Sequence, residues 1–439
     1  MISTTSLVPF PKRVSVFNST TCFSIRLFSS IPSGFGSGLS FRSNRTSSPA
    51  APAPGQWKMG CMKNIGINFF TGSNAKVVKV EVDSGGEDVF DAAAAEARVP
   101  PDHLVIMVNG IIGSSADWKY AAEQFVRQLP DKVIVHRSEC NYSKLTFDGV
   151  DLMGERLAKE VLAVVKNKPQ VQRISFVAHS LGGLVARYAV ARLYQESQKL
   201  DLSSSSGKSL SKENLNSVPS HDQPSEARIA GLEPMNFITV ATPHLGSRGN
   251  KQLPFLCGLP FLERRASQTA HLIVGRTGNH LFLTDTDNGK PPLLLQMVND
   301  SDDLRFISAL RAFKRRVAYA NANFDHMVGW RTSSIRRQNE LPKPNLLVTD
   351  EKYPHIVYVE QQQMESACNR TSTVIRDQAI DLEEEMIKGL TQVRWERVDV
   401  SFHKSRQRYI AHSTIQVKTY WFNSDGADVV FHMIDNFLL

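Results

Sequence analysis

One stretch of the sequence, residues 174–187 (ISFVAHSLGGLVAR), constrains the fold more than any other. An apolar run with β-branched residues stops at Ser180, and a pattern with helical spacing starts directly after it. This order predicts a buried strand, a sharp turn and a helix. Ala178 and Gly182 lie two residues before and after the serine, where strand and helix nearly touch and only small side chains fit. Such a turn lifts a hydroxyl toward the helix N-terminus, so Ser180 is a candidate nucleophile; the alternative is a serine that only caps the helix.

The segment 177–184 (VAHSLGGL) resembles the α/β-hydrolase superfamily. More closely, it resembles the plant and yeast putative serine esterases that include lipid-droplet phospholipases. The resemblance extends from about Asp102 to the C-terminus, and Ala178 stands where the common pattern has glycine. It implies an α/β-hydrolase fold, which is a mostly parallel doubly wound sheet with a lid-like insertion.

Strands and helices alternate along the chain, as in a doubly wound parallel sheet. The continuous apolar run at 103–109 (HLVIMVN) is typical of a strand that is buried on both faces. Strands are expected at 77–82, 103–109, 132–136, 171–180, 235–241, 316–320, 353–360 (antiparallel) and 397–402. Helices are expected from 117, from 146, after 180, around 380–390 and near 429–437.

The N-terminal segment has the composition of a targeting sequence. Residues 1–80 hold nine Lys or Arg, many Ser and Thr, and no acidic residue before Glu81. We therefore expect residues 1–60 to be a disordered transit peptide and linker, and residues 75–439 to form the hydrolase domain. The high Ser and Thr content and weak amphipathicity favour the plastid (chloroplast), with the mitochondrion as second choice.

The charge and cysteine patterns exclude several function classes. Subtracting the nine N-terminal charges from the total of +8 leaves −1 for the remaining residues, so no nucleic-acid partner is expected. The five cysteines are odd in number and scattered, which indicates a reduced compartment and no disulfide framework. No apolar run is long enough to span a bilayer, and no motif indicates a metal or nucleotide cofactor.

Two insertions interrupt the expected sheet. Residues 195–226 are polar and serine-rich, so we expect a disordered insertion. Residues 250–310 form a long excursion that contains the very apolar segment 253–262 (LPFLCGLPFL). Two interpretations of this segment are open: a lid that touches a membrane or lipid droplet, or a helical cap packed on the core.

A serine hydroxyl needs an imidazole as base and a carboxylate to orient it, and on this fold the acid and then the base follow the serine in the chain. Asp325 follows the expected strand at 316–320, and His412 follows the last strand. They are the predicted acid and base. The competing carboxylates and imidazoles are Asp285, Asp287, Asp300, Asp302, Asp303, His244, His326, His403 and His432.

Two main-chain amides are the expected donors to the oxyanion. By the resemblance, the amides of Ile111 and Leu181 hold the oxyanion, although Asn109 stands where related hydrolases have histidine.

His179 is expected to shape the turn or the pocket. His280 and Asp285 match the His-x4-Asp spacing of some acyltransferases, which is a weak signal.

The sequence therefore predicts a serine carboxylester hydrolase, with a Ser180, Asp325 and His412 triad. The resemblance and the apolar insertion favour lipid esters. The alternatives are an acyltransferase or thioesterase that uses the same triad, and a non-catalytic binding scaffold.

Overall fold

The computed structural model describes residues 78–83, 86–91, 100–196, 227–247, 274–286, 289–360 and 378–439. The expected transit peptide at 1–60, most of the polar insertion at 195–226 and the apolar segment 253–262 lie outside these ranges. The chain divides into two compact units, 1–71 and 72–439, and every described residue belongs to the second.

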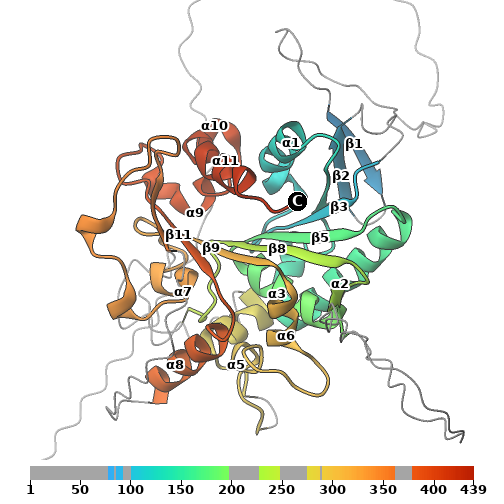
Figure 1. Ribbon diagram of the computed structural model, residues 1–439. Helices are drawn as coiled ribbons and strands as arrows, with labels where there is room; N and C mark the ends of the chain where they lie inside the picture. The colour runs from blue at the N-terminus through green and yellow to red at the C-terminus, as the bar shows by residue number, and fades with distance from the viewer. Residues whose placement is uncertain are drawn as a thin grey trace, which may run out of the picture. The chain divides into compact units, whose positions relative to one another are not determined.

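A nine-stranded sheet organises the described part of the chain, in the order β1-β2-β4-β3-β5-β8-β9-β11-β10 (Figure 1). Its six central strands, from β4 to β11 in that order, are parallel. Antiparallel pairs occur only at its ends, including the pair of β10 with β11. The strands are β1 (Val78–Asp83), β2 (Gly86–Asp91), β3 (His103–Val108), β4 (Val133–Ser138), β5 (Arg173–His179), β8 (Glu233–Val240), β9 (Arg315–Asn321), β10 (Ile356–Glu360) and β11 (Glu396–Val400). The predicted α/β fold is confirmed.

Helices cover both faces of the sheet, which is why every residue of β3 and β4 is buried. On one face lie α1 (Lys119–Gln128) and α11 (Ala427–Asp435), and on the other α2 (Val150–Asn167), α3 (Leu181–Leu193), α6 (Phe306–Ala312) and α8 (Gln378–Leu390) (Figure 1). Each face has its own hydrophobic cluster. The apolar strands therefore form the middle layer of three.

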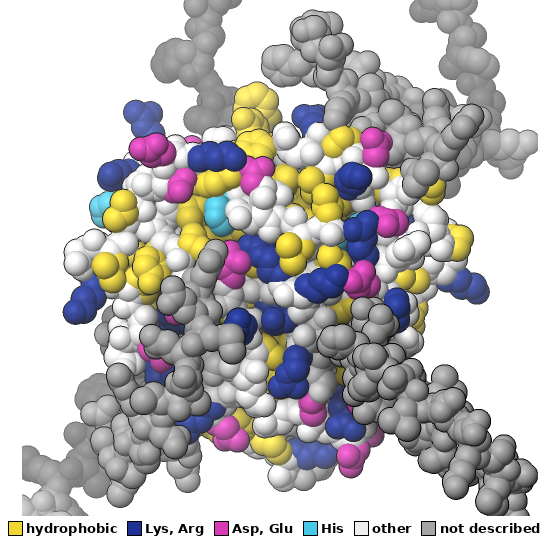
Figure 2. Space-filling model, viewed as in Figure 1, with side chains coloured by type: hydrophobic (Ala, Val, Ile, Leu, Met, Phe, Trp, Pro, Cys, Tyr) yellow, Lys and Arg dark blue, Asp and Glu magenta, His cyan; other side chains and the backbone are white. Residues whose placement is uncertain are grey.

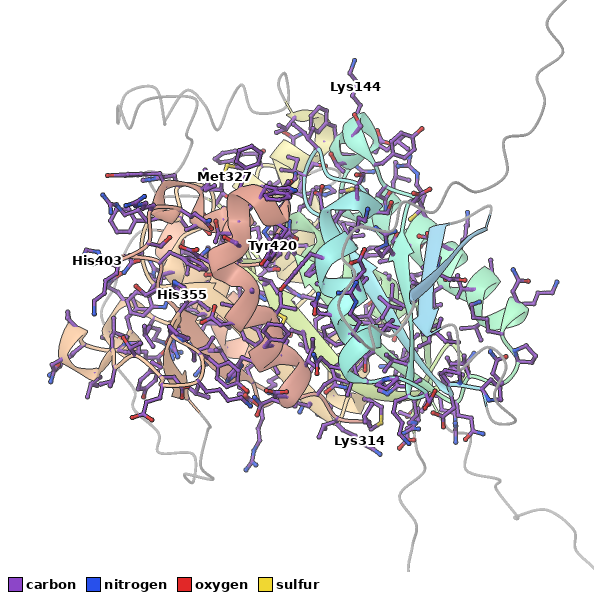
Figure 3. All side chains as sticks on the ribbon, turned by 90° about the horizontal axis from the view of Figure 1, so that it is seen from above. Lys144, Lys314, Met327, His355, His403 and Tyr420 are labelled. Carbon is purple, nitrogen blue, oxygen red and sulfur yellow. The ribbon has the colours of Figure 1, made fainter. Side chains whose placement is uncertain are left out.

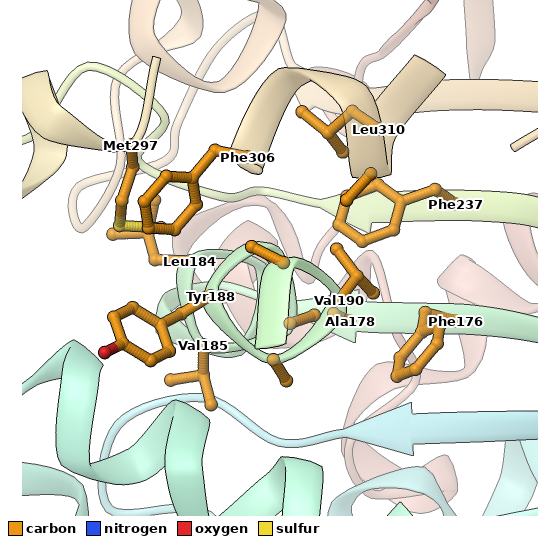
Figure 4. Close-up of a cluster of buried hydrophobic side chains, with 14 of the residues drawn as sticks. Phe176, Ala178, Leu184, Val185, Tyr188, Val190, Phe237, Met297, Phe306 and Leu310 are labelled. Atoms are coloured by element: carbon orange, nitrogen blue, oxygen red, sulfur yellow. The ribbon is translucent and has the colours of Figure 1, made fainter. Parts of the chain in front are cut away.

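Helix α3 lies in the centre of one of these clusters (Figure 4). Every residue from 181 to 191 is buried, because α2 and α6 cover the sides of α3 that the sheet leaves open. Tyr188 on α3 meets Phe306 on α6, with ring centroids 5.8 Å apart. The fully enclosed helix fixes the position of its own N-terminus, where Ser180 lies.

The described part of the range 250–310 packs on the core. It contains a helix at 274–282, α5 (Leu293–Gln296) and the start of α6. Leu294, Met297 and Ile307 are among its buried residues. These residues form part of the connection from β8 to β9, in which α6 packs against α3.

Charges of both signs intermingle on the face of the molecule shown in Figure 2. Arg315, at the start of β9, forms a bidentate pair with Glu396 at 2.7 and 2.9 Å. Arg173 pairs with Asp102 at 2.5 Å. Both pairs lie at the starts of strands of the sheet.

Candidate active site

The turn between β5 and α3 has the backbone of a strained elbow. Strand β5 ends at His179, and Ser180 adopts φ 53° and ψ −129° before α3 begins at Leu181. A non-glycine residue with positive φ is uncommon and costs conformational energy, so the surrounding structure must hold it in place. The Ser180 amide donates to the Val240 carbonyl at 2.8 Å, and the residue is 4% exposed.

Small residues around the elbow leave no room for anything larger. A Cβ atom on Gly182 would lie 2.5 Å from the Asn109 carbonyl oxygen, and one on Gly183 would lie 2.1 Å from Thr242 Oγ1. A Cβ on Gly110 would lie 2.9 Å from the Cβ of Ser180. The close approach of β3, β5 and α3 at this point therefore requires the glycines that the sequence places there.

His412 connects Ser180 to Asp325 by hydrogen bonds. Its Nε2 lies 3.0 Å from Ser180 Oγ, and its Nδ1 lies 3.0 Å from Asp325 Oδ2. An ionised carboxylate only accepts, so Nδ1 carries the proton that faces Asp325 and Nε2 accepts from the serine hydroxyl. The structure thus brings together three residues that the chain order selected, with the tautomer that a general base needs.

Three different elements supply these side chains. Asp325 follows the end of β9 by four residues, and His412 lies on α9 (Ala411–Thr414), after β11. Because β5, β9 and β11 are parallel, the segments that follow them meet at one edge of the sheet. Figure 3 shows Lys314, which precedes β9, and Met327, two residues after Asp325, toward opposite sides of the molecule.

Asp325 is buried, with a side chain 2% exposed, yet it stays ionised. Burial alone raises the pKa of Asp325, but the nearby His412 and several hydrogen bonds lower it below its ordinary value. Asn321 donates to Oδ2 at 2.9 Å, and the amides of Met327 and Val328 donate to Oδ1 at 2.9 Å each. Asn321 and these amides were not anticipated from the sequence, although Asn321 is the last residue of β9.

The main-chain donors beside Ser180 are Ile111 and Leu181. Ile111 lies in a turn closed by the bond from the Gly113 amide to the Gly110 carbonyl at 3.1 Å. Within the described part of the chain, neither the Ile111 nor the Leu181 N–H donates a hydrogen bond. The next amide, that of Ile112, is occupied by Thr146 Oγ1 at 3.0 Å. Two unoccupied N–H groups thus flank the serine on the β3 turn and at the N-terminus of α3.

Asn109 stabilises this turn with two side-chain hydrogen bonds. Its side-chain amide donates to the Gly110 carbonyl at 3.1 Å and to the Asn141 carbonyl at 2.9 Å. The substitution of asparagine for the histidine of related hydrolases therefore supplies hydrogen bonds to the turn and leaves its backbone donors in place.

His179 contacts the base from the opposite side. Its Nε2–H donates to the main-chain carbonyl of His412 at 2.7 Å, and the two rings lie 4.6 Å apart. Burial, followed by the proximity of His412, holds the pKa of His179 well below its usual range. His179 is therefore a neutral donor, and its contact with His412 was not anticipated from the sequence.

The His-x4-Asp pair has a structural role. His280 Nδ1 accepts from the Val150 amide at 3.0 Å, at the start of α2, and Nε2 faces Asp285 Oδ2 at 3.7 Å. With Nδ1 accepting, Nε2 carries the proton, so neither ring nitrogen is available as a base. Asp285 in turn accepts from the Leu293 amide at 2.8 Å, at the start of α5.

Several of the carboxylates and histidines that compete with Asp325 and His412 have structural partners. Asp300 accepts from the Ile307 and Ser308 amides, and His244 bonds Thr239 Oγ1 at 2.9 Å. His403 lies against Phe324, with ring centroids 5.5 Å apart. Asp287 lies outside the described residues.

Neither a metal cluster nor a membrane span is present in the described ranges. Across these residues, no group of three or more His, Cys, Asp or Glu side chains is placed to hold a metal ion. Among the helices that the structure describes, none has both the length and the apolar character needed to cross a bilayer.

The chain is similar to known esterases and lipases. Residues 99–335 match the family model described as "Putative serine esterase (DUF676)". "Putative lipase C4A8.10" of Schizosaccharomyces pombe is 28% identical over 243 residues, covering 53% of this chain and 26% of that protein. "Putative lipase ROG1" of Saccharomyces cerevisiae is 30% identical over 238 residues, covering 53% and 28%. The chain thus matches only about a quarter of the length of these relatives.

Similar solved structures are distant. An α/β-hydrolase superfamily protein from Enterococcus faecalis is 11% identical, with 80% of this chain and 100% of that chain covered and a TM-score of 0.36. The mature lipase BlEst2 of Bacillus licheniformis is 14% identical, with 52% and 68% covered and a TM-score of 0.29.

Proposed function

The chain belongs to the putative serine esterase family of the α/β-hydrolase superfamily, and we propose that it hydrolyses carboxylic esters of lipids with Ser180, His412 and Asp325 as a catalytic triad. One observation carries the proposal: His412 bonds Ser180 Oγ and Asp325 Oδ2 at once, each at 3.0 Å. The base is thus within hydrogen-bond reach of both the nucleophile and the orienting carboxylate before any substrate binds.

In the first half of the reaction, Ser180 Oγ attacks the acyl carbonyl while its proton moves to His412 Nε2. The Asp325 carboxylate stabilises the imidazolium that forms. The amides of Ile111 and Leu181 stabilise the negative charge on the carbonyl oxygen. The tetrahedral intermediate collapses when His412 gives the proton to the departing alcohol, which leaves an acyl ester on Ser180.

In the second half, water enters where the alcohol left. His412 Nε2 takes a proton from this water as its oxygen attacks the acyl carbon. Collapse returns the proton to Ser180 Oγ and releases the carboxylic acid. A thiol or second alcohol in place of water would make the same site a transferase, so product analysis with and without added acceptors decides between hydrolysis and transfer.

Two observations support a lipid ester as the substrate: the names of the yeast relatives and one apolar segment of the sequence. The yeast relatives carry the name putative lipase, but the chain matches only about a quarter of their length. The apolar segment 253–262 is compatible with contact to acyl chains. Lipid esters are therefore the first substrates to test, with phospholipids, galactolipids and acylglycerols compared side by side.

The experiment is labelling of the full chain with a fluorophosphonate probe, which reacts with activated serines. We expect Ser180→Ala to abolish labelling, and His412→Ala and Asp325→Ala to reduce it strongly. Ser301→Ala, at an exposed serine outside the site, serves as the matched control and labels like the wild type. Folding is checked by circular dichroism. A folded wild-type protein that fails to label would overturn the enzyme proposal in favour of a non-catalytic scaffold.

We also propose plastid import through residues 1–60, on the strength of their basic, acid-free composition. Fusion of this segment to a fluorescent protein tests it. A signal in mitochondria or the cytosol would contradict the proposal.

A further inference from the structure

Large apolar side chains are exposed on both sides of His412 in the chain. Trp421 is 87% exposed, and Phe422 and Tyr409 are 70% and 64% exposed. Ile410 and Tyr420 are roughly half exposed. The two segments are linked in the fold, because the Gln407 side chain donates to Ser424 Oγ at 3.0 Å. Single exposed apolar residues are ordinary, but a group that includes tryptophan, phenylalanine and tyrosine indicates an interaction surface. We call residues 408–410 together with 420–422 the aromatic surface.

The aromatic surface is attached to the active site by short covalent and hydrogen-bonded links. The turn Arg408–Ile410 leads directly into α9, which carries His412. Helix α10 (Tyr420–Asn423) is tied back to α9 by the bond from Asn423 Nδ2 to Thr414 Oγ1 at 3.0 Å. The Lys418 amide donates to the Ser413 carbonyl at 3.1 Å. The aromatic surface is therefore connected directly to the segment that carries His412.

Ring contacts hold parts of the aromatic surface rigid. Tyr420 stacks on Tyr120 of α1, with ring centroids 4.9 Å apart (Figure 3 labels Tyr420 on the C-terminal helices). The Arg408 guanidinium lies 4.8 Å from the ring centre of Tyr409, and the Tyr409 ring meets Phe324, the neighbour of Asp325. Side chains that are already ordered lose little conformational freedom when a partner covers them.

Basic residues outnumber acidic ones around the aromatic surface. Residues 401–425 contain four basic residues and one acidic residue, Asp425, which accepts from Ser405 Oγ at 2.5 Å. Three of them, Lys404, Arg406 and Arg408, form no salt bridge with a carboxylate in the described ranges, and the fourth, Lys418, pairs with Asp117 at 3.1 Å.

We propose that the aromatic surface, with Lys404 and Arg406, docks the protein onto a bilayer that carries anionic phospholipids. Tryptophan and tyrosine rings favour the boundary between head groups and acyl chains, and Lys or Arg beside them are attracted to anionic head groups. An acidic soluble protein would satisfy the charge but would not require five protruding apolar side chains. The orientation would bring lipid esters to Ser180, so the purpose of docking rests on the proposed function, while the binding does not.

The test is vesicle co-sedimentation with the full chain carrying Ser180→Ala, so that the lipids stay intact. Vesicles of phosphatidylcholine are compared with vesicles that also contain phosphatidylserine. We expect at least about tenfold tighter binding to the anionic vesicles, weakened by added salt. We expect Trp421→Ser/Phe422→Ser to weaken this binding about tenfold or more, and Lys404→Gln/Arg406→Gln to remove most of the preference for anionic lipid.

The matched control lies on α2, where Leu162 is 49% exposed between two exposed lysines, Lys159 and Lys166. Leu162→Ser combined with Lys159→Gln and Lys166→Gln removes the same number of positive charges and one exposed apolar side chain from α2, and it should leave vesicle binding unchanged. Brominated lipids add a second measurement, because they should quench the fluorescence of Trp421, and the part of the quenching that is lost in Trp421→Ser/Phe422→Ser is assigned to this residue among the five tryptophans of the chain.

Three results would overturn the proposal: equal binding to neutral and anionic vesicles, equal binding by the Trp421→Ser/Phe422→Ser variant, or no vesicle binding together with a dimer that this variant dissociates. The last would assign the surface to a second copy of the chain. Hydrolysis of a soluble short-chain ester by the wild type is measured separately. Vesicle binding without hydrolysis would leave docking in place and contradict the proposed function alone.

Discussion

The Nε2–H group of His179 donates a hydrogen bond to the main-chain carbonyl of His412, at 2.7 Å. His179 directly precedes Ser180, the proposed nucleophile. It therefore holds the backbone of the proposed base, His412, which lies 233 positions further along the chain. Burial keeps the pKa of His179 well below its usual range, so the ring stays neutral near pH 7 and above. The hydrogen bond to His412 should therefore not change with pH there. We infer that His179 is a positioning residue for the His412 imidazole.

Replacing His179 tests this inference. His179→Leu removes the donor and should lower kcat for a soluble ester roughly 5- to 100-fold, because a buried hydrogen bond to a backbone carbonyl is worth about 1–3 kcal/mol when only one partner is removed. KM should change little. His179→Gln keeps an N–H donor and should recover part of the lost rate. If His179→Leu lowers stability but leaves kcat unchanged, the contact has only a structural role.

Asn321 offers a test of how Asp325 is held. Asn321→Ala removes the 2.9 Å hydrogen bond to Asp325 Oδ2 and should lower kcat/KM about 10- to 150-fold, since a hydrogen bond to a charged group contributes about 1.5–3 kcal/mol. Asn323→Ala is the matched control, because the amide of Asn323 bonds Ser401 Oγ and does not contact Asp325. Equal losses in the two variants would show that the loop, and not the bond to Asp325, is being measured.

The central strands and the elbow could be predicted from the sequence for a simple physical reason. A strand that is buried on both faces has to be apolar throughout, as β3 is, and a turn as tight as that at Ser180 has to be bordered by small residues. Chain order then places Asp325 and His412 at the same sheet edge as Ser180. These features depend on local sequence and on the direction of parallel strands.

Contacts between distant segments could not be predicted in this way. Nothing in the spacing of His179 and His412 indicates that they meet, because the contact depends on how α9 packs after β11. Arg187 on α3 is a second example: it is 1% exposed, and burial lowers its pKa to about 9. Its guanidinium donates to the carbonyls of His244 and Met297 at 3.4 and 3.0 Å. Pattern reasoning would place an arginine at the surface, since a buried one needs acceptors that only the folded chain supplies.

Ile112 should be a site where stability can be gained. Its φ is 53°, a region that β-branched residues rarely adopt, and its side chain is 59% exposed. We expect Ile112→Gly to raise the free energy of unfolding by roughly 1 kcal/mol, because glycine relieves this strain and few packing contacts are lost. Urea denaturation measures the change. Ile410→Gly is the control, since Ile410 is similarly exposed but has an ordinary φ of −116°, and it should not stabilise the protein.

Buried histidines with opposite pKa shifts contribute to the pH dependence of stability: the pKa of His103 is lowered, as are those of His179, His244 and His432, whereas the pKa of His136 is raised. Burial, with a contribution from Arg173, lowers the pKa of His103 to about 3. Burial alone would also lower the pKa of His136, but its hydrogen bonds to Asp88 and Glu160 raise it to about 9. Below pH 6.5 His103 is protonated in the unfolded chain but stays neutral in the folded protein. The free energy of unfolding therefore falls as the pH drops toward 3. Above pH 6.5 folded His136 keeps a proton that the unfolded chain releases, so its contribution is lost as the pH rises through about 9.

The free energy of unfolding should therefore be greatest near pH 6.5 and should fall on either side by about 1.4 kcal/mol per pH unit for each histidine involved. Urea denaturation between pH 4.5 and 9 measures the curve. His103→Phe keeps an aromatic ring against Phe437 but cannot titrate, so the acid slope should fall by about one proton while the alkaline slope stays. His136→Gln should flatten the alkaline side instead, whatever its effect on absolute stability. If His103→Phe leaves the acid slope as steep as in the wild type, other buried groups control the acid side and His103 is not the one that senses pH.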